Sequence, residues 1–233
     1  MNCTKPSLDL GFPTSDGPTA RLVAQRIIDT LYESMHTPSL SIMQTTGKLD
    51  VGTLLEDMLL LTESHGIHAN LLLGPTDPLD SPVFKKHRIG WLTWETEISG
   101  RESPSLTLID PSDLFALRVY ISGIVTENDG RATFLGDFLD TTFSSISSNE
   151  RLFAFMSQIA SRMKAHEASG AFVISEELHD KQKLAIAHRV ADRVIKIKAL
   201  DGKEERSNLS HSPRLRISSS LTGTRRERAF ALP

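Results

Sequence analysis

Residues 132–135, with the sequence ATFL, form a short apolar run that ends at Gly136 and Asp137. Four residues are too few for a buried helix, and an uninterrupted apolar run of this length is typical of a β-strand covered on both faces. Such a strand needs helices above and below its sheet. The run therefore favours an α/β fold in which this strand is central.

Strand-like and helix-like segments alternate along most of the chain. Helices are predicted where apolar residues recur three or four positions apart, at 18–37, 51–63, 111–126, 150–166 and 181–190. Strands are predicted at 39–44, 68–73, 88–94, 106–109, 132–136, 171–174 and 194–199. This alternation predicts a three-layer α/β sandwich, with a mostly parallel sheet and helices on both faces. The last strand alternates apolar and basic residues, which predicts an edge strand.

The chain divides into three parts by composition. Residues 1–17 are rich in Pro, Gly, Ser and Asp and are interpreted as an irregular arm. Residues 18–199 hold the alternating segments and form the predicted α/β domain. Residues 200–233 are polar and rich in Ser and Arg, so they are either a flexible tail or contribute one late strand near 215–217.

Bulk composition narrows the classes of protein. The chain is 39% hydrophobic and 24% charged, which suits a globular core, and its net charge of -3 gives no reason to expect nucleic-acid binding. The single cysteine, Cys3, excludes a disulfide within the chain and favours a reducing cytoplasm. No apolar run approaches the roughly 18–20 residues that span a bilayer, and the N-terminus lacks the apolar centre of a signal peptide.

The segment Thr45, Thr46, Gly47 and Lys48 follows the first predicted strand and precedes a helix, where a phosphate-binding loop would stand. A complete loop has the pattern G-x-x-x-x-G-K-[ST], in which glycine permits the turn and the hydroxyl reaches magnesium. Here Ile42 and Leu49 occupy the first glycine and hydroxyl positions, so only the Gly-Lys pair remains. The segment is either a remnant nucleotide site or an ordinary strand–helix turn.

Carboxylates follow several of the predicted strands. Asp137 and Asp140 follow the central strand, where a Walker B carboxylate would hold magnesium directly or through water. The alternative is that Asp137 ends a buried strand and accepts hydrogen bonds from a neighbouring loop. Glu95 and Glu176 follow two other strands and either enter the same crevice or lie on the surface. The histidines lack the H-x-x-x-H and H-E-x-x-H spacings, so no metal site is expected.

The C-terminal segment is basic. Interleaved arginines could bind the phosphates of nucleic acid, an acidic membrane surface or an acidic partner, or could simply be solvated. They carry no aromatic stacking pattern. They are Arg214, Arg216, Arg225, Arg226 and Arg228.

Several segments, taken in order, resemble the RecA/KaiC-like ATPase superfamily, and within it a degenerate archaeal branch. They are RIGWLTWET at 88–96, the proline-led helix at 109–125, ATFLGDFLDTTF at 132–143, the phenylalanine-rich helix and strand at 149–178, and HRVADRVIKIK at 188–198. The resemblance covers roughly residues 39–198. It implies a RecA-like sheet in which Asp137 is the Walker B aspartate and residues 45–48 are the phosphate loop, without an intact Walker A motif.

The resemblance also implies ring or dimer assembly and regulatory roles. The expectation is a non-catalytic regulatory or scaffolding protein without a cofactor, which acts through a protein partner or as a homo-oligomer. One alternative is a weak ATPase that uses Lys48 and Asp137 with ATP and magnesium. A second is a nucleic-acid-associated RecA relative that binds through the basic C-terminal segment.

Overall fold

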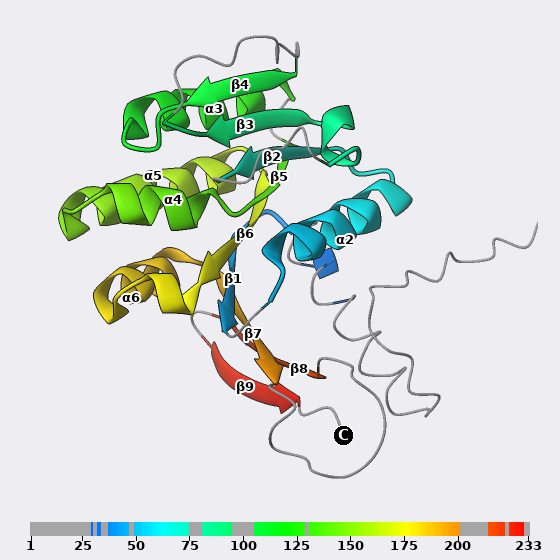
Figure 1. The fold of residues 1–233 in the computed structure, drawn as a ribbon, viewed down its shortest axis with the longest axis vertical. Helices are drawn as coiled ribbons and strands as arrows, with labels where there is room; N and C mark the ends of the chain where they lie inside the picture. The colour runs from blue at the N-terminus through cyan, green and yellow to red at the C-terminus, as the bar shows by residue number, and fades with distance from the viewer. Residues whose placement is uncertain are drawn as a thin grey trace, which may run out of the picture.

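The computed structural model describes residues 29, 32–33, 37–46, 49–74, 81–94, 105–128, 131–200, 214–221 and 224–230, with 198–200 and the last two ranges as backbone alone. At its centre lies one sheet with the strand order β4-β3-β2-β5-β6-β1-β7-β8-β9 (Figure 1). The strands are β1 (Leu40–Thr46), β2 (Ala69–Leu73), β3 (Arg88–Leu92), β4 (Leu106–Ile109), β5 (Thr133–Gly136), β6 (Ser169–Ser175), β7 (Arg193–Leu200), β8 (Arg214–Leu221) and β9 (Thr224–Phe230).

Seven strands, β1 to β7, pair in parallel, and β8 and β9 extend the sheet in antiparallel fashion beyond β7. The mostly parallel α/β sheet that the sequence predicts is therefore confirmed. Strand β1 lies between β6 and β7, and β6 separates β1 from β5. Strand β1, which ends at Thr46, is thus separated by one strand from β5, which precedes Asp137.

Helices cover both faces of the sheet, so the molecule has three layers. They are α2 (Val51–Ser64), α3 (Leu114–Glu127), α4 (Phe138–Ser145), α5 (Asn149–Ala165) and α6 (Lys181–Val190), with short 3-10 helices η1 (Phe84–Lys86) and η2 (Glu176–Leu178). Helices α3 to α6 share one buried cluster with the sheet, and α2 shares the other (Figure 1).

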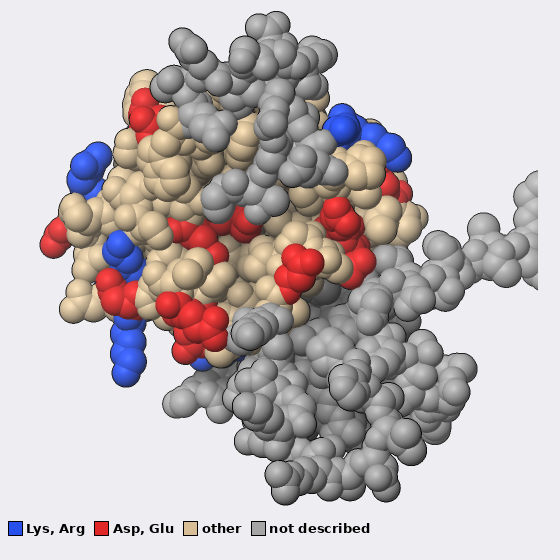
Figure 2. Space-filling model, in the orientation of Figure 1, with Lys and Arg blue, Asp and Glu red and all other residues tan. Residues whose placement is uncertain are grey.

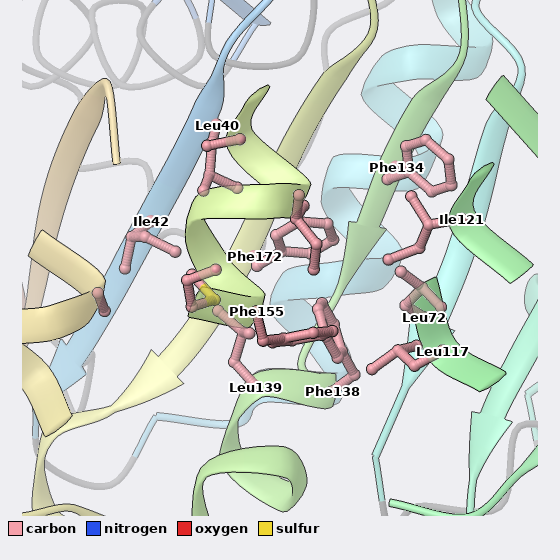
Figure 3. Packing of buried hydrophobic residues seen from close by; sticks show 14 of the residues in the cluster. Leu40, Ile42, Leu72, Leu117, Ile121, Phe134, Phe138, Leu139, Phe155 and Phe172 are labelled. Atoms are coloured by element: carbon pink, nitrogen blue, oxygen red, sulfur yellow. The ribbon is translucent and has the colours of Figure 1, made fainter. Parts of the chain in front are cut away.

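The larger core lies between the sheet and helices α3 to α6 (Figure 3). Phe138 and Phe172 meet edge to face there, with their ring centroids 4.8 Å apart and an interplanar angle of 87°. Such a pair contributes about 0.5–1.5 kcal/mol beyond the apolar area that it buries. Ile42 of β1 is fully buried in the same cluster, which fixes the middle of β1 as a core strand.

The second core lies under α2. Leu55, Met58 and Leu59 recur three or four residues apart on α2 and pack against Leu71 of β2 and Val173 of β6. The sheet is therefore apolar on both faces, which explains why its strands read as continuous apolar runs in the sequence.

Several boundaries differ from those predicted, and one helix was missed. Strand β1 continues through Thr46 instead of ending at Gln44, so Thr45 and Thr46 are not in a turn. Strand β3 ends at Leu92 instead of residue 94, and helix α3 begins at Leu114 instead of residue 111. Helix α4, which follows β5, was not predicted.

The C-terminal strands change the position of β7. Strand β7 is not an edge, because β8 pairs with it from Arg193 to Leu200. The late strand predicted near residues 215–217 corresponds to β8, and the five arginines of the basic segment fall within β8 and β9. Residues 1–17 lie outside the described part of the chain.

Candidate functional site

The parallel strands β1, β2, β5 and β6 point the same way, so their carboxyl ends meet at one edge of the sheet. Thr46, Gly74, Asp137 and Ser175 end or directly follow these four strands. Ligands in open α/β sheets bind at this edge, next to the carboxyl ends of the strands. It is therefore the candidate functional site.

Strand β1 continues as a regular β-strand up to the carboxyl edge of the sheet. Thr45 lies in register with Ser175 of β6 and with Ile197 of β7. Because β1 is an interior strand, its backbone from Leu40 to Thr46 belongs to the ladders on its two sides. Residues 42–46 therefore do not form a loop whose amides surround a phosphate. Gly47 and Lys48 lie outside the described residues.

A carboxylate of the chain occupies the N-terminus of α2. Asp50 Oδ1 accepts hydrogen bonds from the backbone N–H groups of Gly52 at 3.0 Å and Thr53 at 3.4 Å, and Asp50 Oδ2 accepts one from Thr53 Oγ1 at 2.8 Å. The hydroxyl and then the backbone N–H of Thr53 hold the pKa of Asp50 below its ordinary value. Leu49 packs against the apolar core under α2. Phosphate-binding loops place a phosphate at such a helix N-terminus; here a carboxylate is bound instead.

Asp137 stands directly after β5, as predicted, and bonds to the end of the neighbouring strand. Its Oδ1 accepts the backbone N–H of Gly74, which follows β2, at 2.7 Å. Burial raises the pKa of Asp137 to about 6; the hydrogen bond from Gly74 opposes this shift, and the charge of Asp140 adds to it. A Cβ at position 74 would lie 2.7 Å from Thr141 Oγ1 of α4, so a larger residue here would require the Thr141 side chain to move. Asp137 thus ties β5 to β2.

Asp140, on α4, makes three hydrogen bonds to the segment that ends β6. Its Oδ1 accepts the backbone N–H of Ser175 at 2.9 Å and lies 2.8 Å from His179 Nε2. Its Oδ2 accepts Ser175 Oγ at 2.7 Å. Both carboxylate oxygens therefore bond to groups of the chain itself, and they hold α4 against β6.

A second polar network links β1, η2 and α6. Glu176 Oε2 accepts hydrogen bonds from Gln44 Nε2 at 2.6 Å and Thr46 Oγ1 at 2.8 Å, and Gln44 Oε1 accepts one from His188 Nε2 at 2.6 Å. The hydrogen bond from Thr46 is the main reason that the pKa of Glu176 is lowered. Burial lowers the pKa of His188, and the charge of Lys196 lowers it further.

The structure thus brings several of the predicted site residues to the same edge. Asp137 and Asp140 lie close enough for their charges to interact, and Glu176 contacts Thr46. Glu95 lies outside the described residues. Sequence reasoning missed Gln44, His188 and Asp50. A polar Gln44 in an otherwise apolar strand, and an aspartate just before a predicted helix, were the available signals.

Two findings concern what this edge could hold. Among the described residues, no group of three or more His, Cys, Asp and Glu side chains is placed to hold a metal ion. Acidic side chains spread across the middle of the face in Figure 2, and Lys and Arg side chains lie toward its margins.

None of the helices in the described part of the chain is long and apolar enough to cross a bilayer.

The fold matches that of a KaiC-like protein from the hyperthermophilic archaeon Pyrococcus horikoshii. The TM-score is 0.52 and the sequence identity is 10%, over 84% of this chain and 83% of that one. No protein-family model matches the sequence, and no curated protein matches it. At this identity the likeness shows the fold alone, so the chain has a RecA/KaiC-like fold.

Proposed function

We propose that this chain is a non-catalytic RecA/KaiC-like regulatory or scaffolding protein, which acts by binding a protein partner or another copy of itself. One observation carries the proposal. The N-terminus of α2, which would hold the phosphates of a nucleotide, is capped by the carboxylate of Asp50. A phosphate group brought to this position would meet a bound negative charge.

The carboxylate at the N-terminus of α2 matters because nucleotide hydrolysis requires a site that binds phosphates and magnesium. Phosphoryl transfer by this class of fold needs backbone amides around the phosphates, a lysine, and magnesium held partly by a Ser/Thr hydroxyl. The backbone from Ile42 to Thr46 lies in the ladders of β1, and Leu49 brings an apolar side chain that packs in the core. Two like charges about 4 Å apart repel by about 1 kcal/mol in water and about 4 kcal/mol near a protein surface. The residues present therefore do not fit a magnesium nucleotide.

The other carboxylates of the edge support the same proposal. Asp137 bonds to Gly74, Asp140 to Ser175, and Glu176 to both Gln44 and Thr46. Magnesium is usually held by carboxylates that also share it with substrate phosphates. Here each carboxylate joins two elements of the sheet or its flanking helices, which is a structural role.

Surface features favour a role in binding other proteins. Strand β4 is the last strand at its end of the described sheet, and Leu108 on it is 41% exposed. Phe115 and Val119, one turn apart on α3, are 64% and 52% exposed. Unpaired strand edges and exposed apolar residues are common features of protein–protein contacts.

The proposal is tested by phosphate release from ATP with the purified full chain and magnesium. We expect no turnover above background in the wild type, in Lys48→Ala, or in Asp50→Ser, which keeps a capping oxygen but removes its charge. Turnover in the wild type that disappears in Lys48→Ala would replace this proposal with a weak ATPase that uses Lys48 and Asp137.

The interaction half of the proposal needs a separate measurement. Sedimentation of the full chain over a range of concentrations reports whether copies associate. We expect association that Leu108→Lys weakens, because a lysine on an edge strand opposes pairing with a second chain. A monomer at every concentration would direct the search to a different protein partner.

A further inference from the structure

The surface between α3 and α5 is hollowed by a groove of about 660 Å³, a volume within the usual range of small-molecule sites. Its walls are Arg118 and Ser122 from α3 and Ser157, Ser161, Arg162 and His166 from α5. The α5 half of the groove belongs to the end of that helix that leads into the first residue of β6. The groove is therefore separate from the carboxyl edge of the sheet.

The groove is cationic. Arg118 and Arg162 bring two guanidinium groups, and His166 offers at least one ring N–H donor in either protonation state. The three serines add hydroxyl donors. No Asp or Glu is among the described residues that line it. Guanidinium groups bind carboxylates and phosphates through paired N–H donors, so the lining favours an anion.

The cations are arranged in a row. Arg118 Nη1 donates to Gln158 Oε1 at 2.9 Å, which places its guanidinium against α5. Gln158, Arg162 and His166 follow at intervals of four residues, so they lie on one side of α5 over about 12 Å. The guanidinium carbon of Arg118 also lies 5.2 Å from the ring centroid of Phe115. A side chain held at two points loses less conformational freedom when it binds a ligand.

Part of the lining of the groove is apolar. Ile121 of α3 and Ile159 of α5 lie beneath it but are almost fully buried, so they offer a ligand little surface. Ala165 lines the groove and is exposed, and Arg118 and Arg162 bring carbon stems as well as guanidinium groups to the lining. These carbon atoms offer a contact surface to the uncharged part of a ligand. The groove therefore suits a molecule with an anionic end and an apolar body.

We propose that the groove between α3 and α5 binds a small organic anion, with a phosphate or carboxylate group held by Arg118 and Arg162 and an apolar body resting on Ala165 and the carbon stems of the two arginines. This site is independent of the function proposed for the chain as a whole. A phosphate monoester and a carboxylate share the chemistry that the groove recognises, and the probes below separate them.

Calorimetric titration of the full chain at low ionic strength tests the site with phenyl phosphate, benzoate and inorganic phosphate. We expect phenyl phosphate or benzoate to bind, and whichever binds more tightly identifies the anionic group. We expect inorganic phosphate to bind at least about tenfold more weakly than the better of the two, because it has no apolar body to contact the carbon atoms of the lining. Equal binding of inorganic phosphate, or no binding of either organic probe, would overturn the proposal.

Two variants locate the binding. Arg118→Gln combined with Arg162→Gln is expected to weaken it by about tenfold or more, since charge-assisted hydrogen bonds are lost. Arg189→Gln is the matched control, because Arg189 also lies over an exposed ring, 5.5 Å from the centroid of Phe153, but outside the groove. If Arg189→Gln weakens binding equally, the effect comes from the general surface charge and the proposed site is wrong.

Ser161→Leu provides a test that keeps both arginines. Ser161 is exposed, so its replacement does not disturb the core, and a thermal melt checks that the variant is folded. Leucine at this position fills part of the groove and is expected to abolish binding of the organic probe. Unchanged binding in a folded Ser161→Leu variant would show that the ligand does not lie in the groove.

Discussion

At the scale of single residues, the carboxyl edge is held by carboxylates that face the protein itself. Asp137 could be placed at the end of β5 from the sequence, because the apolar run before it fixes the strand. Its partner could not, since Gly74 lies 63 residues earlier in the chain. The link from Gln44 to Glu176 spans 132 residues, and that from Gln44 to His188 spans 144. These hydrogen bonds depend on the order of the strands in the sheet, which a local sequence pattern does not predict.

Asp137→Asn is expected to fold, with a change of at most about 1–2 kcal/mol in the free energy of unfolding at pH 7. The amide oxygen can still accept the N–H of Gly74. The pKa of Asp137 in the folded chain, about 6, lies above the ordinary aspartate value of 3.8. The folded chain therefore binds more protons between these values, and the wild type loses stability as pH rises from about 4 to about 6.

Urea denaturation at pH 4.5 and pH 7 measures both quantities. The variant is expected to lose less stability over this interval than the wild type, because the asparagine does not titrate. Complete unfolding of Asp137→Asn at pH 7 would show instead that the charged carboxylate is essential to the fold.

Gly136→Ala is expected to be strongly destabilising, by more than about 3 kcal/mol, or to prevent folding. A Cβ at this position would lie 1.7 Å from the carbonyl oxygen of Leu72, which is part of the backbone and cannot move aside. Gly123→Ala on α3 is the control, since no atom lies within 4 Å of its Cβ. There the alanine is expected to stabilise the helix by about 0.5–1 kcal/mol. Comparable thermal melts of the two variants would refute the steric argument.

At the scale of elements, periodicity predicted most of the strands and helices, and it failed where tertiary contacts decide. Helix α4 (FLDTTFSS) has only eight residues, and Asp137 before it was interpreted only as the end of a strand; in the structure its side chain bonds to Gly74 and makes no capping hydrogen bond. Strand β1 is extended through Thr46 by pairing with β7, although the two threonines resemble a turn. Strand β7 was expected to be an edge because it alternates apolar and basic residues, but β8 pairs with it.

Asp50→Ala tests the cap of α2. We expect a loss of about 0.5–2 kcal/mol in the free energy of unfolding, because the N–H groups of Gly52 and Thr53 lose their acceptor. Asp50→Ser should recover most of the loss, since a serine oxygen can accept the same hydrogen bonds. Chemical denaturation of the three proteins measures this. Equal stability of Asp50→Ala and the wild type would mean that the carboxylate does not hold the helix end.

At the scale of the whole molecule, the three-layer sheet was predicted in outline, and its C-terminal extension was one of two alternatives. Among the residues whose side chains the structure describes, the members of the two core clusters run from Leu40 to Ile197. Strands β8 and β9 extend the sheet beyond β7. The extension thus covers the backbone edge of β7.

Removal of the chain after Leu200 is expected to leave a domain that unfolds cooperatively but associates with itself. Truncation exposes the row of backbone groups on β7 that pairs with β8 over eight residues, and an unpaired strand of that length recruits other strands. Thermal melts report folding, and light scattering reports association. A truncated chain without a cooperative transition would make β8 part of the folding unit, and one that stays monomeric would show that the exposed edge is harmless.

The hydrogen bonds at the carboxyl edge also have a consequence for motion. When a ligand binds at the edge of a sheet, the strand ends there must open locally to admit it. Amide hydrogens at such an edge therefore normally exchange quickly with solvent when the ligand is absent. In this chain, side-chain hydrogen bonds connect β2 to β5, α4 to β6, and β1 to η2 and α6. The edge is therefore stiff without any bound molecule. Its amides should exchange about as slowly as those at the centre of the strands, so this edge of the sheet presents a rigid surface.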